Sequence, residues 1–287
     1  MKLIVKKVNY KKQTFSCIIG NQLVDFYLTN RLSKLFLDHL TKDVIVDFAV
    51  SGKTKRIDQR KAYEVSHFNL IENYKNKVTI YDHNQLKQDM IGFLESNDYY
   101  MFLDLEMTIP FYRQKDFIPE IVQYGYFLVD KNGKTIDKNG NYVKTKIQKN
   151  INRRTIKFLK LDITSYNQTK IPFISFYNEM KALIKKYNPK IVVWGKNDIQ
   201  ALNYGYKIYK LKPLTNELDF VDLLKLHKDY FNLRNDLGLF KAYETYYDES
   251  IKQTHDAKDD AKITKKVFAA FLNYSNIEYK DKEQTGK

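Results

Sequence analysis

The sequence predicts an α/β protein with two parts: a small β-barrel, and a larger domain in which a mixed sheet is flanked by helices. In residues 1–82, short strands alternate with turns around a single short helix. From residue 97 onward, strands are followed by helices, which is the order typical of an α/β domain. Apolar residues make up 43% of the 287 residues, enough for each part to bury a core.

The first part, residues 1–82, is predicted to be a β-rich domain. Three strands, one helix and then further strands follow one another along the chain. This is the order of an OB-type barrel, a fold that often binds single-stranded nucleic acid. Many small barrels share the order, so a structural or protein-binding barrel remains an alternative. The strands are expected at 3–8, 14–19, 23–28, 44–50, 62–70 and 78–81, with the helix at 31–40.

Residues 83–96 are predicted to form a helical linker, residues 97–276 the α/β domain, and residues 277–287 a polar tail. In the α/β domain, apolar runs and helical spacing define the elements. Strands are expected at 100–105, 121–129, 142–148 and 191–194. Helices are expected at 154–159, 174–187, 198–209, 221–230, 238–246 and 256–273.

The chain is strongly basic, with a formal net charge of +15 at pH 7. Such a charge favours a polyanionic partner, of which nucleic acid is the commonest. A lysine-rich solvated surface would give the same charge without a function. No stretch approaches the roughly 20 apolar residues that cross a bilayer, and Cys17 is the only cysteine. We therefore expect a cytoplasmic protein with no membrane partner, and the oligomeric state stays open.

Two carboxylates interrupt the apolar strand at 99–108. Asp104 and Glu106 are two residues apart, so on a strand they share one face. Two acids on a core strand repel each other and are costly to bury. Divalent cations, which prefer oxygen ligands, would relieve that repulsion. A strand end whose acids simply reach water is the alternative for this motif alone.

A second candidate is Asp198, which follows the buried strand at 191–194 and begins a helix. Taken alone, it reads as a helix N-cap. A third candidate pair is His255 and Asp260, five residues apart. Inside one helix the two would point about 140° apart, so they converge only if His255 lies in the loop before the helix. An acidic helix start with an incidental histidine is the alternative.

Together and in this order, these pieces resemble the DEDDh group of 3′–5′ exonucleases, most closely its KapD-type and Eri-type branch. The group's pattern is Asp-x-Glu on the first strand, an Asp in mid-domain and His-x-x-x-x-Asp on a late helix. Residues 104–110, 119–125, 194–198 and 238–261 carry the resemblance to the branch. The resemblance implies a ribonuclease-H-like fold for about residues 97–275, and it does not extend to residues 1–82.

The resemblance implies a metal-dependent phosphodiesterase with two Mg²⁺ or Mn²⁺ ions per site. Asp104, Glu106, Asp198 and Asp260 are the predicted metal residues, and His255 is the predicted general base. The resemblance also implies that Met107 and Thr108 meet the terminal nucleotide and that the products are nucleoside 5′-monophosphates. Asp256 and Asp259 fall outside the motif's register and receive no metal role.

The expected partner is single-stranded nucleic acid. RNA is favoured, because the Eri-type branch acts on RNA and an OB-like barrel suits single strands. DNA, as in proofreading, stays open. A non-catalytic nucleic-acid-binding protein, or a regulator acting through protein contacts, is the alternative from another class. Such proteins usually lose an acid or the histidine, and this sequence lacks none of them.

Overall fold

The computed structural model describes residues 2–111, 116–231, 233 and 235–274. It divides into two compact units, Met1–Met90 and Ile91–Lys287. The division falls within helix α2 (His83–Glu95), which covers most of the predicted linker. The predicted tail at 277–287 lies outside the described residues.

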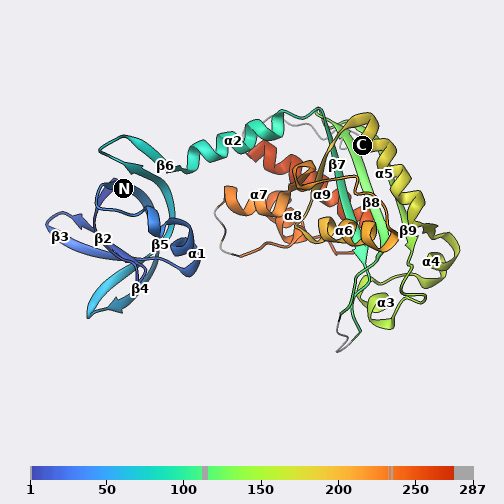
Figure 1. The fold of residues 1–287 in the computed structure, drawn as a ribbon, viewed down its shortest axis with the longest axis horizontal. Helices are drawn as coiled ribbons and strands as arrows, with labels where there is room; N and C mark the ends of the chain where they lie inside the picture. The colour runs from blue at the N-terminus through green and yellow to red at the C-terminus, as the bar shows by residue number, and fades with distance from the viewer. Residues whose placement is uncertain (1, 112–115, 232, 234, 275–287) are drawn as a thin grey trace. The chain divides into compact units, whose positions relative to one another are not determined.

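The first unit is a closed five-stranded barrel (Figure 1). Its strand order is β3-β2-β1-β4-β5, and a parallel pairing of β3 with β5 closes the ring. Helix α1 (Asn30–Phe36) lies between β3 and β4, as the sequence predicted for a small barrel. The strands are β1 (Lys2–Asn9), β2 (Thr14–Ile19), β3 (Gln22–Tyr27), β4 (Val44–Ile57), β5 (Arg60–Asn73) and β6 (Val78–Asp82).

Strands β4 and β5 are longer than the strands predicted from their apolar segments at 44–50 and 62–70. Both run for 14 residues, and their outer halves form a hairpin that turns at Asp58 and Gln59; its β4 side is exposed, whereas its β5 side is partly buried. The hairpin escaped prediction because Ser51, Lys53 and Thr54 are polar and carry no alternation. Inside the barrel, stacked and edge-to-face rings of Phe15, Phe26, Phe48 and Phe68 fill the core.

The second unit is built on a six-stranded mixed sheet of order β10-β9-β8-β7-β11-β12. Strand β7 pairs antiparallel with β8 on one side and parallel with β11 on the other. The strands are β7 (Tyr99–Met107), β8 (Ile121–Asp130), β9 (Thr135–Lys144), β10 (Ile171–Pro172), β11 (Lys190–Val193) and β12 (Phe220–Asp222). This is the ribonuclease-H-like α/β fold.

Helices cover both faces of this sheet (Figure 1). Met101, Leu103 and Leu105 of β7 belong to the core that includes α5 and α6. Tyr100 and Phe102, which alternate with them, contact Phe268 of α9. The helices are α3 (Arg153–Leu159), α4 (Ile163–Thr169), α5 (Phe173–Tyr187), α6 (Asn197–Tyr209), α7 (Leu223–Tyr230), α8 (Leu239–Tyr247) and α9 (Ala257–Tyr274). Every helix in the described ranges falls short of the length or apolarity that a bilayer crossing requires.

Several details of the second unit differ from the prediction. Residues 221 and 222, which were expected to begin a helix, belong to β12, so α7 begins at Leu223; strand β10 was not expected. The strand expected at 142–148 begins at Thr135 and ends at Lys144. Its expected last residues instead turn, because the backbone N–H groups of Lys146, Ile147 and Gln148 donate to the buried carboxylate of Glu120. The short helix α4 was not predicted, because only Ile163 and Tyr166 of its seven residues are apolar.

Candidate active site

The two acids of β7 lie on the face of the sheet that α9 covers. Asp104 and Glu106 continue the alternation of Tyr100 and Phe102. Both are only partly exposed, and the Glu106 side chain is 13% accessible. The fold therefore brings a pair of carboxylates under a helix, where water cannot fully solvate them.

Glycine allows α9 to approach these acids. Gly125 of β8 is the register partner of Asp104, and Gly140 of β9 is the partner of Gly125. A Cβ atom at Gly125 would lie 2.2 Å from the backbone nitrogen of Lys258, and one at Gly140 would lie 3.1 Å from the Lys258 Cβ. The first turn of α9 thus rests on bare backbone beside Asp104.

That approach places Asp260 in the site. It projects from the first turns of α9 and is only 4% exposed. One oxygen, Oδ2, accepts a hydrogen bond from the Gln253 side chain at 3.3 Å. The other, Oδ1, is buried with no hydrogen-bond partner in the described protein. A buried carboxylate oxygen without a partner is costly, and a bound cation would satisfy it.

Asp198 reaches the site from the opposite direction. Strand β11 ends at Val193, and its last pairing with β7 joins Val192 to Phe102. The N–H of Leu105 lies beyond that pairing and donates instead to Asp198 Oδ1 at 2.8 Å. Asp198 lies in the first turn of α6 and is 5% exposed. It is therefore bound to the strand between the two acids of β7, and it does not act only as a cap.

His255 lies in the loop before α9, as the five-residue spacing required. Its backbone is left-handed (φ 57°), a conformation that turns the chain into the helix two residues later. Nδ1 lies 3.8 Å from Glu106 Oε1. The ring packs on Phe158 with centroids 5.0 Å apart. Lys160 fixes the same loop by donating from Nζ to the Gln253 carbonyl at 3.0 Å.

Burial and mutual repulsion raise the pKa values of the four acids. Burial raises the pKa of Asp104 well above its usual range, and the charges of Asp198 and Asp260 raise it further. Burial and the Asp260 charge raise the pKa of Glu106 to about 8. Burial also raises the pKa of Asp198 to about 7 and that of Asp260 to about 6. Without positive charge, the four acids would not all be ionised near neutral pH.

These residues fit a divalent cation. Donor atoms of Glu106, His255 and Asp260 lie within 4.8 Å of one another. The partnerless Asp260 Oδ1 and the raised carboxylate pKa values both indicate missing positive charge. Hard cations such as Mg²⁺ take this kind of oxygen donor.

Met107 and Thr108 line a cavity of about 250 Å³ beside the acids. Gln200 of α6 lines it too. The polar groups of Thr108 are used internally: its hydroxyl accepts from the Glu120 N–H at 2.9 Å and from the Gln148 side chain at 2.7 Å. Its own N–H donates to the Glu120 carbonyl. Thr108 therefore shapes the cavity wall, while Met107 offers it an apolar surface.

Asp256 has a structural task for which it was not singled out in the sequence. Its Oδ1 accepts from the N–H groups of Lys258 and Asp259, and its Oδ2 accepts from Gln123 of β8 at 2.6 Å. It caps α9 and ties that helix to the sheet. An Asp directly before a helix signals such a cap. The glycines and Gln253 were also missed, and only Gly125, an isolated glycine in an apolar strand, gave a signal.

Residues 101–268 match the family described as Exonuclease (RNase_T), a span that holds every acid above and His255. The chain belongs to this exonuclease family. Its four acids and His255 stand in the order of the DEDDh 3′–5′ exonucleases, the group that the sequence resembles. A relative from Bacillus subtilis (strain 168), named "Probable 3'-5' exonuclease KapD", is 27% identical over 170 residues, which are 58% of this chain and 82% of the relative.

Solved structures share the fold of this exonuclease. The nuclease domain of 3′hExo, a DEDDh family member bound to rAMP, aligns with a TM-score of 0.56 at 18% identity, over 64% of this chain and 96% of that one. Cell-death related nuclease 4 (CRN-4) aligns with a TM-score of 0.53 at 18% identity, over 62% of this chain and 64% of that one. E. coli Exonuclease I in complex with a dT13 oligonucleotide aligns with a TM-score of 0.51 at 15% identity, over 63% of this chain and 42% of that one.

Proposed function

We propose that this DEDDh exonuclease removes nucleotides from the 3′ ends of single-stranded RNA and releases nucleoside 5′-monophosphates. The observation that carries the proposal is the convergence of Asp104, Glu106, Asp198 and Asp260 around a buried, partnerless carboxylate oxygen, with His255 beside them. RNA is favoured over DNA because a structural neighbour, the nuclease domain of 3′hExo, is bound to rAMP, and because of the small barrel that precedes the nuclease. Another neighbour, E. coli Exonuclease I, is in complex with a dT13 oligonucleotide, so DNA is the competing substrate.

Asp104, Glu106 and Asp260 would hold one divalent cation, and Asp104 and Asp198 would face a second. Such ions, when bound, neutralise the phosphodiester and lower the pKa of the attacking water. Only Oδ2 of Asp198 is fully available to an ion, because Oδ1 already accepts a hydrogen bond from the Leu105 N–H. Its influence on the second ion would therefore pass largely through water.

His255 would act as the general base. Burial and the positive charge of Lys160 lower its pKa below the ordinary value, so the imidazole is neutral and able to accept a proton near pH 7. Phe158 and the loop geometry hold its ring beside Glu106. His255 is also within reach of a metal, so a ligand role is the competing assignment.

The apolar wall at Met107 would receive the base or sugar of the terminal nucleotide. The cavity there has the volume for a base, and its lining includes Met107 and Asn197, which are the sequence neighbours of Glu106 and Asp198. We also propose that the barrel is an OB fold. Its order of five strands with a helix between the third and fourth, and its closure through β3 and β5, support that assignment.

One experiment tests the proposal directly. Labelled RNA and DNA oligomers of one sequence are digested side by side with Mg²⁺, with Mn²⁺ and with chelator. We expect 3′-end shortening of RNA with either ion, slower shortening of DNA, and none with chelator. Faster digestion of DNA would contradict the RNA assignment. Undiminished digestion by folded Asp104→Asn or Asp260→Asn would refute the site itself.

A further inference from the structure

A cluster of cations on the barrel unit has no role in the exonuclease site. The loop after β1 carries Lys11 and Lys12, and the hairpin joining β4 to β5 has five cations between positions 53 and 61 against a single acid, Asp58. Six cations form what we call the basic surface: Lys7, Lys11, Lys53, Lys55, Arg56 and Lys61. All six are exposed.

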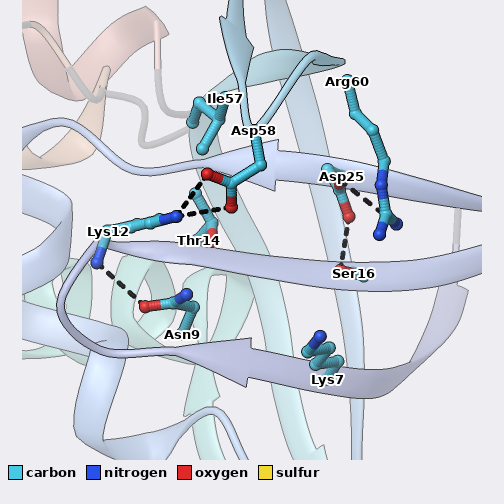
Figure 2. Close-up of a pocket in the computed structure, with 9 residues that line it drawn as sticks. All are labelled: Lys7, Asn9, Lys12, Thr14, Ser16, Asp25, Ile57, Asp58 and Arg60. Atoms are coloured by element: carbon cyan, nitrogen blue, oxygen red, sulfur yellow. Dashed lines mark hydrogen bonds and ion pairs between the residues drawn. The ribbon is translucent and has the colours of Figure 1, made fainter.

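One ion pair joins the loop to the hairpin, and a second joins the hairpin to β3 (Figure 2). Lys12 of the loop pairs with Asp58 of the hairpin, and Arg60 lies 4.0 Å from Asp25 of β3. Asp25 also accepts a hydrogen bond from the Ser16 hydroxyl at 2.6 Å. These residues surround a hollow of about 60 Å³. Exposed pairs add little stability, but the Lys12–Asp58 pair keeps the two cationic segments side by side.

The pairing leaves the surface with excess positive charge. Asp25 and Asp58 are engaged by Arg60 and Lys12, whereas no member of the basic surface forms an ion pair with a described residue. Lys55 lies over the Tyr27 ring, 4.0 Å from its centroid, which holds the chain of this lysine against the barrel and leaves its charge unneutralised. Unpaired, clustered cations attract a polyanion.

An aromatic side chain accompanies the charge. Tyr10, in the loop between β1 and β2, is 54% exposed although it is large and apolar. Aromatic rings beside cations are the platform on which single-stranded bases stack while their phosphates are neutralised. Duplex DNA or an acidic protein would offer no unstacked bases to such a ring. The combination therefore favours a single strand.

We propose that the basic surface, with Tyr10, binds the phosphates and bases of a single strand upstream of the 3′ end that the exonuclease unit trims. The inference rests on the proposed function, since it names where the body of that substrate is held. It predicts that the barrel increases affinity for long strands and contributes nothing to cleavage of very short ones.

The test compares two triple variants of the full chain. The surface variant carries Lys11→Gln, Lys53→Gln and Arg56→Gln. The control variant removes the same charge elsewhere on the same unit: Lys34→Gln in α1, and Lys42→Gln and Lys77→Gln at the other end of the β4–β5 ladder. All six lysine and arginine side chains are exposed, so both variants should fold.

Binding of a labelled 20-nucleotide RNA is measured in chelator across a salt series. We expect the surface variant to bind about tenfold more weakly at low salt, with a salt slope smaller by about 2, since each phosphate contact to a single strand contributes about 0.7. Tyr10→Ser should weaken binding with no change of slope. A control variant that loses as much affinity as the surface variant would overturn the proposal.

The second part of the test measures cleavage. With Mg²⁺, the surface variant should raise KM for the 20-nucleotide strand and leave the rate on a trinucleotide unchanged. Equal losses on both lengths would also overturn the proposal. Because binding is measured without cleavage, a chain that digests neither RNA nor DNA would refute the proposed function and still leave the binding result interpretable.

Discussion

The backbone of Lys258 occupies the space into which a side chain at position 125 would project. Because Gly125 has no side chain, the first turn of α9 can pack directly on the backbone of β8. Asp104 lies directly across the ladder from this glycine. The distance between Asp104 and Asp260 is thus set by a missing side chain. The packing of α9 on β8 therefore also brings the acids together.

Replacing Gly125 with Ala should therefore disable the enzyme without touching a polar group. The added methyl must displace the backbone of Lys258, since 2.2 Å is far inside van der Waals contact. We expect a loss of about 1–3 kcal/mol in the free energy of unfolding, measured with urea, together with weaker metal binding by calorimetry. Gly92→Ala is the control, because nothing lies within 4 Å of its added Cβ and stability there should hold or rise. Wild-type metal affinity in Gly125→Ala would contradict the argument.

The His255→Ala variant distinguishes a general-base role of His255 from a role as a metal ligand. We expect kcat to fall by a factor of about 10²–10⁴, the range for a lost general base. The metal affinity should stay within about twofold of the wild-type value, because the substitution leaves the carboxylate ligands unchanged. The readouts are single-turnover cleavage and a metal titration. A parallel loss of metal affinity would assign His255 to the cation instead.

Asp198 allows its structural and chemical tasks to be measured apart. Asn at this position keeps an oxygen that can accept from the Leu105 N–H, whereas Ala leaves that buried donor without a partner. Asp198→Ala should cost about 1–3 kcal/mol of stability, and Asp198→Asn much less. Both variants should lose activity, because both remove the charge. Full activity in Asp198→Asn would exclude a metal role for this carboxylate.

The stability of the metal-free protein should fall as pH rises. The folded-state pKa of Glu106 is raised to about 8 and that of Asp260 to about 6, above the values in the unfolded chain. The folded state therefore binds more protons, so its stabilisation is present at low pH and is lost as pH rises between about 4 and 8. Melting in chelator from pH 5 to pH 8 tests this sign.

Adding Mg²⁺ should reverse that trend, since the ion competes with the same protons. The gain in Tm on adding Mg²⁺ should be larger at pH 8 than at pH 5.5. In Asp104→Asn the gain should shrink at both values. A gain that is independent of pH would show that these carboxylates do not hold the ion.

Much of the site could be predicted from the sequence because its chemistry is local. The acids of β7 follow from strand alternation, and the placement of His255 outside the helix follows from helical periodicity. Both positions are observed. The roles of these residues, and of Met107 and Thr108, remain predictions that the experiments above address.

What could not be predicted depends on contacts between distant segments. The bond from Leu105 to Asp198 exists only because β11 leaves the sheet before reaching that N–H. The turn at 146–148 forms around Glu120, whose carboxylate is supplied by another strand. Neither the early end of a neighbouring strand nor the position of a buried partner leaves a periodic trace in the sequence.

The spread of the site along the chain has a consequence for its synthesis. Asp104 and Glu106 emerge early, Asp198 later, and Asp260 only with α9. Because domains fold as they leave the ribosome, the barrel can be complete while the nuclease still lacks its last acid. Until α9 has left the ribosome, a nascent chain therefore lacks Asp260, and the four acids can come together only once that helix has packed on Gly125.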